Sequence, residues 1–172
     1  DLAPESPLFD LPNVVVTPHR GAATTEAQEN VALQVAEQMS DYLLSGAVQN
    51  ALNMPSVTAE EAKVMGPWIK LTGHLGNFIG QMTDEPIKAI NILYDGTVAE
   101  MNLPALNCSV IAGIMKRANP DVNMVSAPII AQERGINIST TNQAKSGVFD
   151  AYIKVTVVTD KRERPVAGTV FS

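Results

Sequence analysis

The sequence predicts an α/β chain of two unequal parts, in which a strand and a long helix precede an α+β unit built from helices and a small antiparallel sheet. Three observations lead to this prediction. A run of three valines stops at a proline, Pro18. Apolar residues recur at helical spacing over residues 25–45 and 59–82. Apolar and polar residues alternate over residues 149–157, which is typical of a half-buried strand.

The composition is that of a globular chain and excludes several classes of function. The 172 residues are 45% hydrophobic and 17% charged, with a formal net charge of −6, so non-specific nucleic-acid binding is not expected. No apolar run approaches the roughly 18 residues of a membrane span. A single cysteine, Cys108, fits a reducing compartment, and we expect a cytoplasmic protein. With two histidines and one cysteine, no metal site is predicted.

The amino-terminal part, residues 1–55, is predicted to hold one strand and one helix. Three consecutive valines predict a strand over residues 13–17 that is buried on both faces. Thr24 or Thr25 can cap the helix, and Gly46 ends it. One side of this helix is apolar, with Val31, Val35, Met39 and Leu43 along it. Residues 50–56 (NALNMPS) resemble an extended linker, so we place the boundary to the second part, residues 56–172, there.

The second part opens with a capping-box pattern, Thr58-Ala-Glu-Glu61, which predicts the start of a helix. The apolar side of this helix is predicted to consist of Val64, Trp68, Leu71, Leu75, Phe78 or Ile79, and Met82. Pro67 predicts a kink or a restart of this helix. Gly73, Gly76 and Gly80 lie at helical spacing, although glycine costs a helix about 1 kcal/mol per position. This row of three glycines predicts that the backbone of another element packs closely against the helix. The alternative explanation is that the helix is simply weak at these positions.

Apolar patterns and turn residues predict the remaining elements. They are a strand over 87–94 and a turn at 95–96, a helix over 103–117, a helix from Asp121 or Asn123 to Arg134 closed by Gly135, a strand over 149–157, and a hairpin partner over 165–171.

One segment has a catalytic appearance, residues 17–22 (TPHRGA). A histidine directly after a strand lies where open α/β sheets bind ligands, and an imidazole can exchange a proton near neutral pH. This makes His19 a candidate general base. From spacing alone, a histidine in a surface turn is the commoner explanation.

The residues around His19 resemble a known family. Residues 11–28 (LPNVVVTPHRGAATTEAQ) resemble the late segment of the NAD-dependent D-2-hydroxyacid dehydrogenases, and the longer run to Asn53 resembles the D-3-phosphoglycerate dehydrogenase branch. The stretch from Thr58 to Ser172 is similar to the intervening, or allosteric substrate-binding, domain of the long type I members. The segments that carry this similarity are 122–128 (VNMVSAP), 133–135 (ERG) and 166–171 (VAGTVF).

The resemblance implies an enzyme that uses NAD to oxidise 3-phosphoglycerate to 3-phosphohydroxypyruvate in L-serine biosynthesis. Residues 1–55 would be the remnant of a Rossmann-type catalytic region, with His19 as general base and Gly21 beside the nicotinamide. A family glutamate hydrogen-bonds this histidine, and either Asp1 takes its place or that residue precedes Asp1. The family's substrate arginine and glycine-rich NAD loop are not among these residues, so the fragment itself is expected to be inactive.

For the second part, the resemblance implies a role in assembling a homotetramer and in binding an anionic effector, through basic residues placed beyond Ser172 and before an ACT domain. Both ends of the sequence suggest a piece of a longer protein. The alternative hypothesis is a non-catalytic module for oligomerisation or anion binding.

Overall fold

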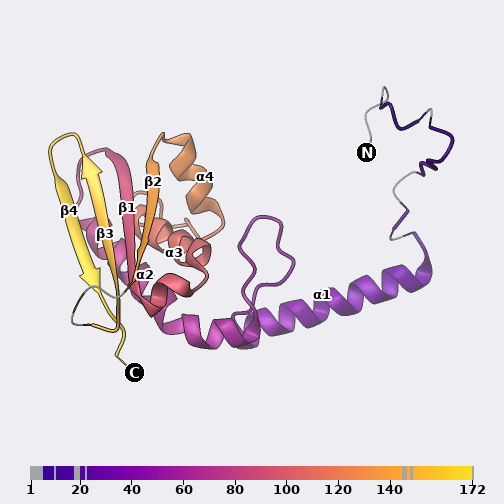
Figure 1. Ribbon diagram of the computed structural model, residues 1–172, viewed down its shortest axis with the longest axis horizontal. Coiled ribbons are helices and arrows are strands. Elements are labelled where there is room, and N and C mark those ends of the chain that lie inside the picture. The colour runs from indigo at the N-terminus through magenta and orange to yellow at the C-terminus, as the bar shows by residue number, and fades with distance from the viewer. Residues whose placement is uncertain are drawn as a thin grey trace.

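The computed structural model describes residues 6–9, 11–17, 20–21, 23–144, 147 and 149–171. In this part of the chain, one long helix projects from a layered body that consists of a sheet with helices on one face (Figure 1). The elements are, in chain order, α1 (Thr25–Ser45), α2 (Ala59–Gln81), β1 (Ile87–Gly96), the 3-10 helix η1 (Thr97–Glu100), α3 (Leu103–Met115), α4 (Ser126–Glu133), β2 (Asn137–Gln143), β3 (Ala151–Thr159) and β4 (Glu163–Gly168).

The sheet has the strand order β2-β1-β3-β4, in which β1 and β2 are parallel and the other two pairs are antiparallel. The α+β class is confirmed, but the sheet is mixed rather than antiparallel throughout as predicted. The parallel pair arises because the chain crosses over through α3 and α4 before it returns as β2. Strand β2 was not expected from the sequence, because its segment NISTTNQ has one large apolar residue, Ile138, and lacks apolar alternation.

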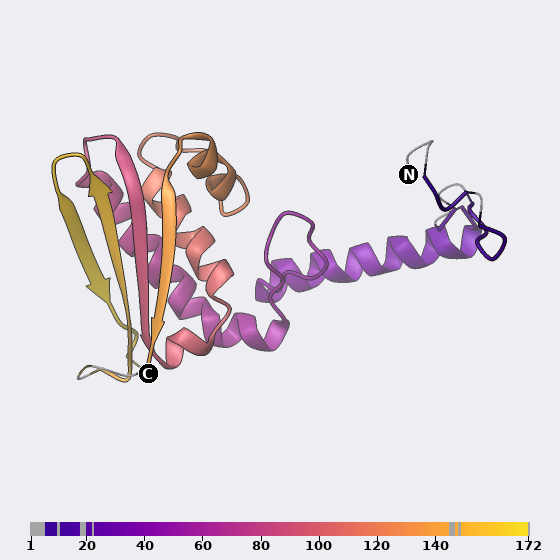
Figure 2. The same cartoon turned by 45° about the horizontal axis from the view of Figure 1, so that its top comes forward.

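Helices α2 and α3 cover one face of the sheet, and the hydrophobic core lies between helices and sheet (Figure 2). The predicted alternation in β1 and β3 is confirmed, because every second side chain is almost completely buried. These side chains are Ile90, Ile92, Tyr94, Ala151, Ile153, Val155 and Val157. Because full burial of one large apolar side chain contributes about 1.5–3 kcal/mol, the two central strands supply much of the core's stabilisation.

Helices α2 and α3 pack so closely that their backbones touch at glycine residues. A Cβ atom on Gly76 would overlap the Val110 carbonyl oxygen and lie 3.1 Å from the Ile114 nitrogen. A Cβ atom on Gly113 would lie only 2.5 Å from the Gly73 carbonyl oxygen. The prediction that another backbone packs against the glycine stripe is therefore confirmed over the alternative of a weak helix.

Helix α2 begins at the predicted capping box, in which the Thr58 hydroxyl accepts from the Glu61 nitrogen and the Glu61 carboxylate accepts from the Thr58 nitrogen. It continues through Pro67 as one helix and does not restart. Its buried side is turned slightly from the predicted one. Val64 is 61% exposed, and Ile79 rather than Phe78 faces the core.

Helix α1 has the predicted ends but not a packed face. The Thr24 hydroxyl accepts from the Ala27 nitrogen at the first turn, and Gly46 ends the helix at φ 76°. Figure 1 shows α1 leading away from the body. The apolar residues predicted to share one side are exposed by between 48% and 77% (Val31, Val35, Met39 and Leu43).

The predicted strand over residues 13–17 is wrong. Residues 14–17 have no regular secondary structure, and Val15 is 90% exposed. A strand needs a neighbour to accept and donate its backbone hydrogen bonds, and none of the strands in the described residues lies beside these valines.

The later elements exist as predicted but with shifted bounds: α4 begins at Ser126 instead of Asp121 or Asn123, and β3 covers residues 151–159 instead of 149–157. Asp95 and Gly96 end β1 instead of forming a separate turn, and η1 makes the connection to α3. The Asn123 side chain accepts from the Val125 and Ser126 nitrogens just before α4, and Gly135 follows α4 at φ 68°. Strand β4 pairs with β3 as the predicted hairpin partner but ends at residue 168.

Candidate functional site

The predicted catalytic segment is only partly described. His19 and Asp1 lie outside the described residues, so their roles stay predictions. Gly21 lies in an exposed turn closed by a 3.1 Å hydrogen bond from the Ala23 nitrogen to the Arg20 carbonyl oxygen. A Cβ atom on Gly21 would meet nothing within 4 Å, so this piece of backbone is open to a ligand or to another part of a longer protein.

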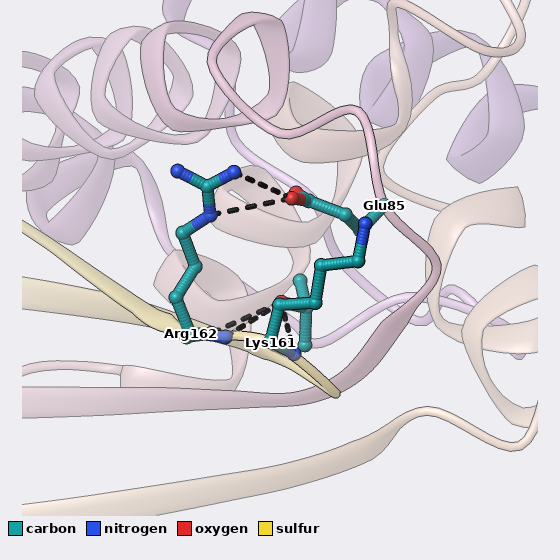
Figure 3. Close-up of polar contacts among 4 residues, drawn as sticks. Glu85, Lys161 and Arg162 are labelled. Atoms are coloured by element: carbon teal, nitrogen blue, oxygen red, sulfur yellow. Dashed lines mark hydrogen bonds and ion pairs between the residues drawn. The ribbon is translucent and has the colours of Figure 1, made fainter.

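The best-defined polar cluster lies where the α2–β1 connection meets the β3–β4 turn (Figure 3). Both Nε and Nη2 of Arg162 donate to one carboxylate oxygen of Glu85, at 3.2 and 2.8 Å. The turn itself is built by Thr159, whose hydroxyl accepts from the backbone nitrogens of Lys161 and Arg162. The ion pair therefore joins two segments that are 77 residues apart in the sequence.

Two further ion pairs surround this cluster. Arg117 at the end of α3 bonds Asp84 at 2.8 Å and also donates to the Gln81 carbonyl oxygen at 2.8 Å. Lys88 and Asp160 approach to 3.6 Å and are both well exposed. A cavity of about 620 Å³ adjoins the cluster. Its lining includes the charged residues Asp84, Glu85, Arg117 and Arg134 and apolar residues such as Ile87 and Met115. Both carboxylates in this lining are paired with arginines, Asp84 with Arg117 and Glu85 with Arg162, and these pairs hold different elements together.

The contacts of Glu85 make it unsuited to donating a proton at neutral pH. The hydrogen bonds from Arg162 lower the pKa of Glu85 below its ordinary value of 4.5, so the carboxylate stays ionised. An ionised carboxylate that is held by a guanidinium is a poor general base, because protonation would break the pair. We therefore assign the cluster a structural role in fixing the hairpin turn against the helical layer.

Replacing Glu85 by glutamine is expected to lower the melting temperature by about 1–3 °C at pH 7. Because the folded-state pKa of Glu85 is lowered, its stabilising effect is complete above the ordinary pKa of 4.5 and is lost as the pH falls through the lowered value. Circular dichroism melting curves at pH 7 and at successively lower pH values below 4.5 should show the difference between the two proteins shrinking. Glu163→Gln, an exposed glutamate on β4, is the control and should not change the melting temperature. A difference for Glu85→Gln that does not shrink as the pH falls below 4.5 would contradict this prediction.

Two side chains that could serve as nucleophiles, Tyr94 and Cys108, have structural roles instead. The Tyr94 hydroxyl donates to Asn107 at 2.8 Å, and Asn107 donates to the Thr140 hydroxyl at 3.0 Å, which connects β1, α3 and β2. Burial raises the pKa of Tyr94, so its hydroxyl stays protonated. Burial also raises the pKa of the Cys108 thiol, which makes it a weak nucleophile. Within the described residues, no group of three or more His, Cys, Asp and Glu could hold a metal ion.

A shallow groove beside the α2–α3 contact has a different charge. It measures about 440 Å³, and its lining includes Lys70, Lys116 and Asn77 but no aspartate or glutamate. Gly73, Gly113 and the exposed His74 are also among its lining residues. Its two lysines and the absence of a carboxylate in its lining suit an anion.

The fold and these sites define a class of protein, an α+β domain whose described residues hold paired charges and a cationic groove but no complete catalytic set. The chain belongs to the D-3-phosphoglycerate dehydrogenase intervening domain family, whose model matches residues 64–172. The resemblance seen in the sequence is thereby confirmed. None of the described helices has the length and apolar character that crossing a membrane requires.

Curated relatives extend the similarity over nearly the whole chain. The D-3-phosphoglycerate dehydrogenase of Bacillus subtilis is 34% identical over 96% of this chain, and that of Synechocystis is 35% identical over 98%. The protein of the same name from Methanocaldococcus jannaschii is 32% identical over 98%. The chain spans about a third of the length of these relatives, between 31% and 32%.

Proposed function

We propose that this chain is part of an NAD-dependent dehydrogenase that oxidises 3-phosphoglycerate to 3-phosphohydroxypyruvate in L-serine biosynthesis. The observation that carries the proposal is the extent of the similarity. Relatives named D-3-phosphoglycerate dehydrogenase align with 96–98% of the chain, although the family match begins only at residue 64. The similarity therefore includes the segment with His19 and Gly21 as well as the intervening domain.

In this proposal the chain divides at residue 55, and the two parts have different tasks. The first part supplies His19, which takes the proton of the substrate hydroxyl during oxidation and returns it to the carbonyl oxygen in the reverse direction. The second part assembles subunits, as a tetramer in the intact enzyme. The cytoplasm is the expected location for such a biosynthetic enzyme.

The cofactor must be held mainly by residues of a longer protein. When bound, NAD accepts the hydride from the substrate carbon. Of the described residues, the open turn at Gly21 fits a place beside the nicotinamide, because its backbone is uncovered and carries no side chain. No glycine-rich phosphate-binding loop occurs in these 172 residues. The chain alone is therefore expected to be inactive.

The test is an absorbance assay at 340 nm on the longer protein that contains this chain. With 3-phosphoglycerate and NAD we expect NADH formation, and with 3-phosphohydroxypyruvate and NADH we expect its consumption. The isolated chain, as the matched control, should show neither reaction. A folded longer protein that binds NAD but acts on neither compound would contradict the proposed substrate.

A second candidate is a non-catalytic module for oligomerisation or anion binding, and one observation favours it. The groove with Lys70 and Lys116 presents two cations without a carboxylate in its lining, on a chain whose net charge is −6. An anionic effector such as a phosphorylated metabolite would be attracted there. The same assay separates the two candidates, because a module alone would give no turnover in the longer protein.

A further inference from the structure

The first part of the chain has one cationic side chain, and it adjoins the candidate base. Arg20 is the single lysine or arginine in residues 1–55, and it lies between His19 and the open turn at Gly21. The same residues include seven acids, which are Asp1, Glu5, Asp10, Glu26, Glu29, Glu37 and Asp41. An anionic ligand of the first part therefore has Arg20 as its one opportunity for an ion pair within these residues.

The cations of the second part lie at the other end of a long helix. Helix α1 begins at Thr25, shortly after Arg20, and its 21 residues give it a length of about 30 Å. Figure 1 shows the segment before α1 at the end of this helix that is remote from the sheet. Within the part of the chain that the structure describes, no other lysine or arginine lies close to this turn.

The side chain of Arg20 has no structural task among the described residues. It is exposed, and no hydrogen bond or ion pair with them engages its guanidinium group. Only its backbone is used, because its carbonyl oxygen accepts from the Ala23 nitrogen and closes the turn. Arg117 and Arg162, by contrast, are bonded to carboxylates and join different elements. The backbone thus fixes the turn, and the Arg20 side chain is available to a ligand.

The proposed substrate has a group that such a side chain binds well. In 3-phosphoglycerate, the carbon with the reacting hydroxyl is bonded to a carboxylate on one side and to the phosphate-bearing carbon on the other. A phosphate carries nearly two charges and three acceptor oxygens, so it attracts a guanidinium more strongly than a carboxylate does. A guanidinium also matches phosphate oxygens with two parallel hydrogen bonds.

We propose that Arg20 binds the phosphate of the substrate and thereby selects a phosphorylated 2-hydroxyacid over its unphosphorylated form. Consecutive Cα atoms are about 3.8 Å apart, so a long side chain next to His19 can reach a group two carbons from the hydroxyl that His19 deprotonates. The inference rests on the proposed function, because it assigns a residue to one part of the substrate that the function names. Arg20 is a binding residue and moves no proton.

Steady-state kinetics of the longer protein test this role. Arg20→Leu is expected to raise the Michaelis constant for 3-phosphoglycerate by about 10- to 100-fold, with the turnover number and the Michaelis constant for NAD nearly unchanged. D-Glycerate, which lacks the phosphate, serves as a competitive inhibitor, and its inhibition constant should stay the same. Arg20→Lys keeps the charge without the fork and should give an intermediate Michaelis constant. Arg134→Leu, which removes another exposed arginine, is the control and should change none of these values.

The proposed function and the role of Arg20 fail in different ways. A wild type that does not oxidise 3-phosphoglycerate overturns the function and this inference with it. With an active wild type, an unchanged Michaelis constant for 3-phosphoglycerate in Arg20→Leu overturns the inference alone. Equal weakening of D-glycerate would place the guanidinium at the carboxylate, and a raised Michaelis constant for NAD would place it at the cofactor, so either result also overturns it. Matching melting temperatures show that the variants are folded, and Arg20→Lys carries the same test if the leucine variant does not fold.

Discussion

Replacing Gly76 by leucine is expected to destabilise the domain by about 3 kcal/mol, at the upper end of what overpacking a core typically costs. The Cβ atom alone would overlap the Val110 carbonyl oxygen and lie 3.1 Å from the Ile114 nitrogen. Both obstacles are backbone atoms of a helix, so they cannot turn away as a flexible side chain can. Either α3 moves off α2, which opens the core, or the helix distorts. Since domains are stable by only about 5–15 kcal/mol, the loss is a large share of the total.

Urea unfolding followed by circular dichroism measures this effect, and the same helix supplies the control. Apart from its chain neighbours and the backbone of its own helix, a Cβ atom on Gly66 would meet nothing within 4 Å, so Gly66→Ala should change the free energy of unfolding by no more than about 1 kcal/mol. An unaltered unfolding midpoint for Gly76→Leu would show that the close approach of α2 and α3 is not required. Equal losses in both variants would contradict the packing explanation, because alanine and leucine both favour a helix over glycine and only the contact at position 76 is expected to lower stability.

Replacing His19 by alanine in the longer protein is expected to lower the turnover number by about 10²–10⁴. The proposed role explains the size, because without the imidazole the substrate hydroxyl must lose its proton to water while hydride leaves. The Michaelis constant for NAD should stay nearly unchanged, since the proton transfer does not hold the cofactor. Steady-state assays in the oxidative direction measure both quantities.

The pH profile makes the test specific for a proton acceptor. A base must be neutral to act, so wild-type turnover in oxidation should fall as the pH drops below the imidazole pKa, ordinarily about 6.5. The His19→Ala variant should lose this limb of the profile. His74→Ala, which removes the other histidine from an exposed position on α2, should keep both the rate and the profile. Wild-type turnover in His19→Ala would contradict the assignment of the base.

Features that depend on neighbours in the sequence were predictable. The ends of α1 at Thr24 and Gly46 and the capping box at Thr58 are local hydrogen-bonding devices, so short patterns were enough to find them. The core sides of β1 and β3 were predictable because alternation marks a strand with one buried face. The glycine stripe indicated a close backbone approach, although it could not name α3 as the partner.

Other features escaped the sequence because they depend on distant segments. The valines of residues 14–16 have strong strand propensity but no adjacent strand, and propensity cannot supply one. Strand β2 has little apolar patterning and exists because β1 provides its hydrogen bonds. The pair of Glu85 and Arg162 joins segments 77 residues apart, and no pattern at short range could have indicated it.

The sequence by itself determined the α+β class, most helix and strand boundaries, and the family resemblance that led to His19 and Gly21. The tertiary structure alone decided which sides are covered. It left the apolar side of α1 exposed, buried Met65 instead of the predicted Val64 on α2, and placed β2 at an edge of the sheet. The physical reason is that periodicity determines on which side of its own helix or strand a residue lies. Burial depends in addition on which other element packs against that side and excludes water from it.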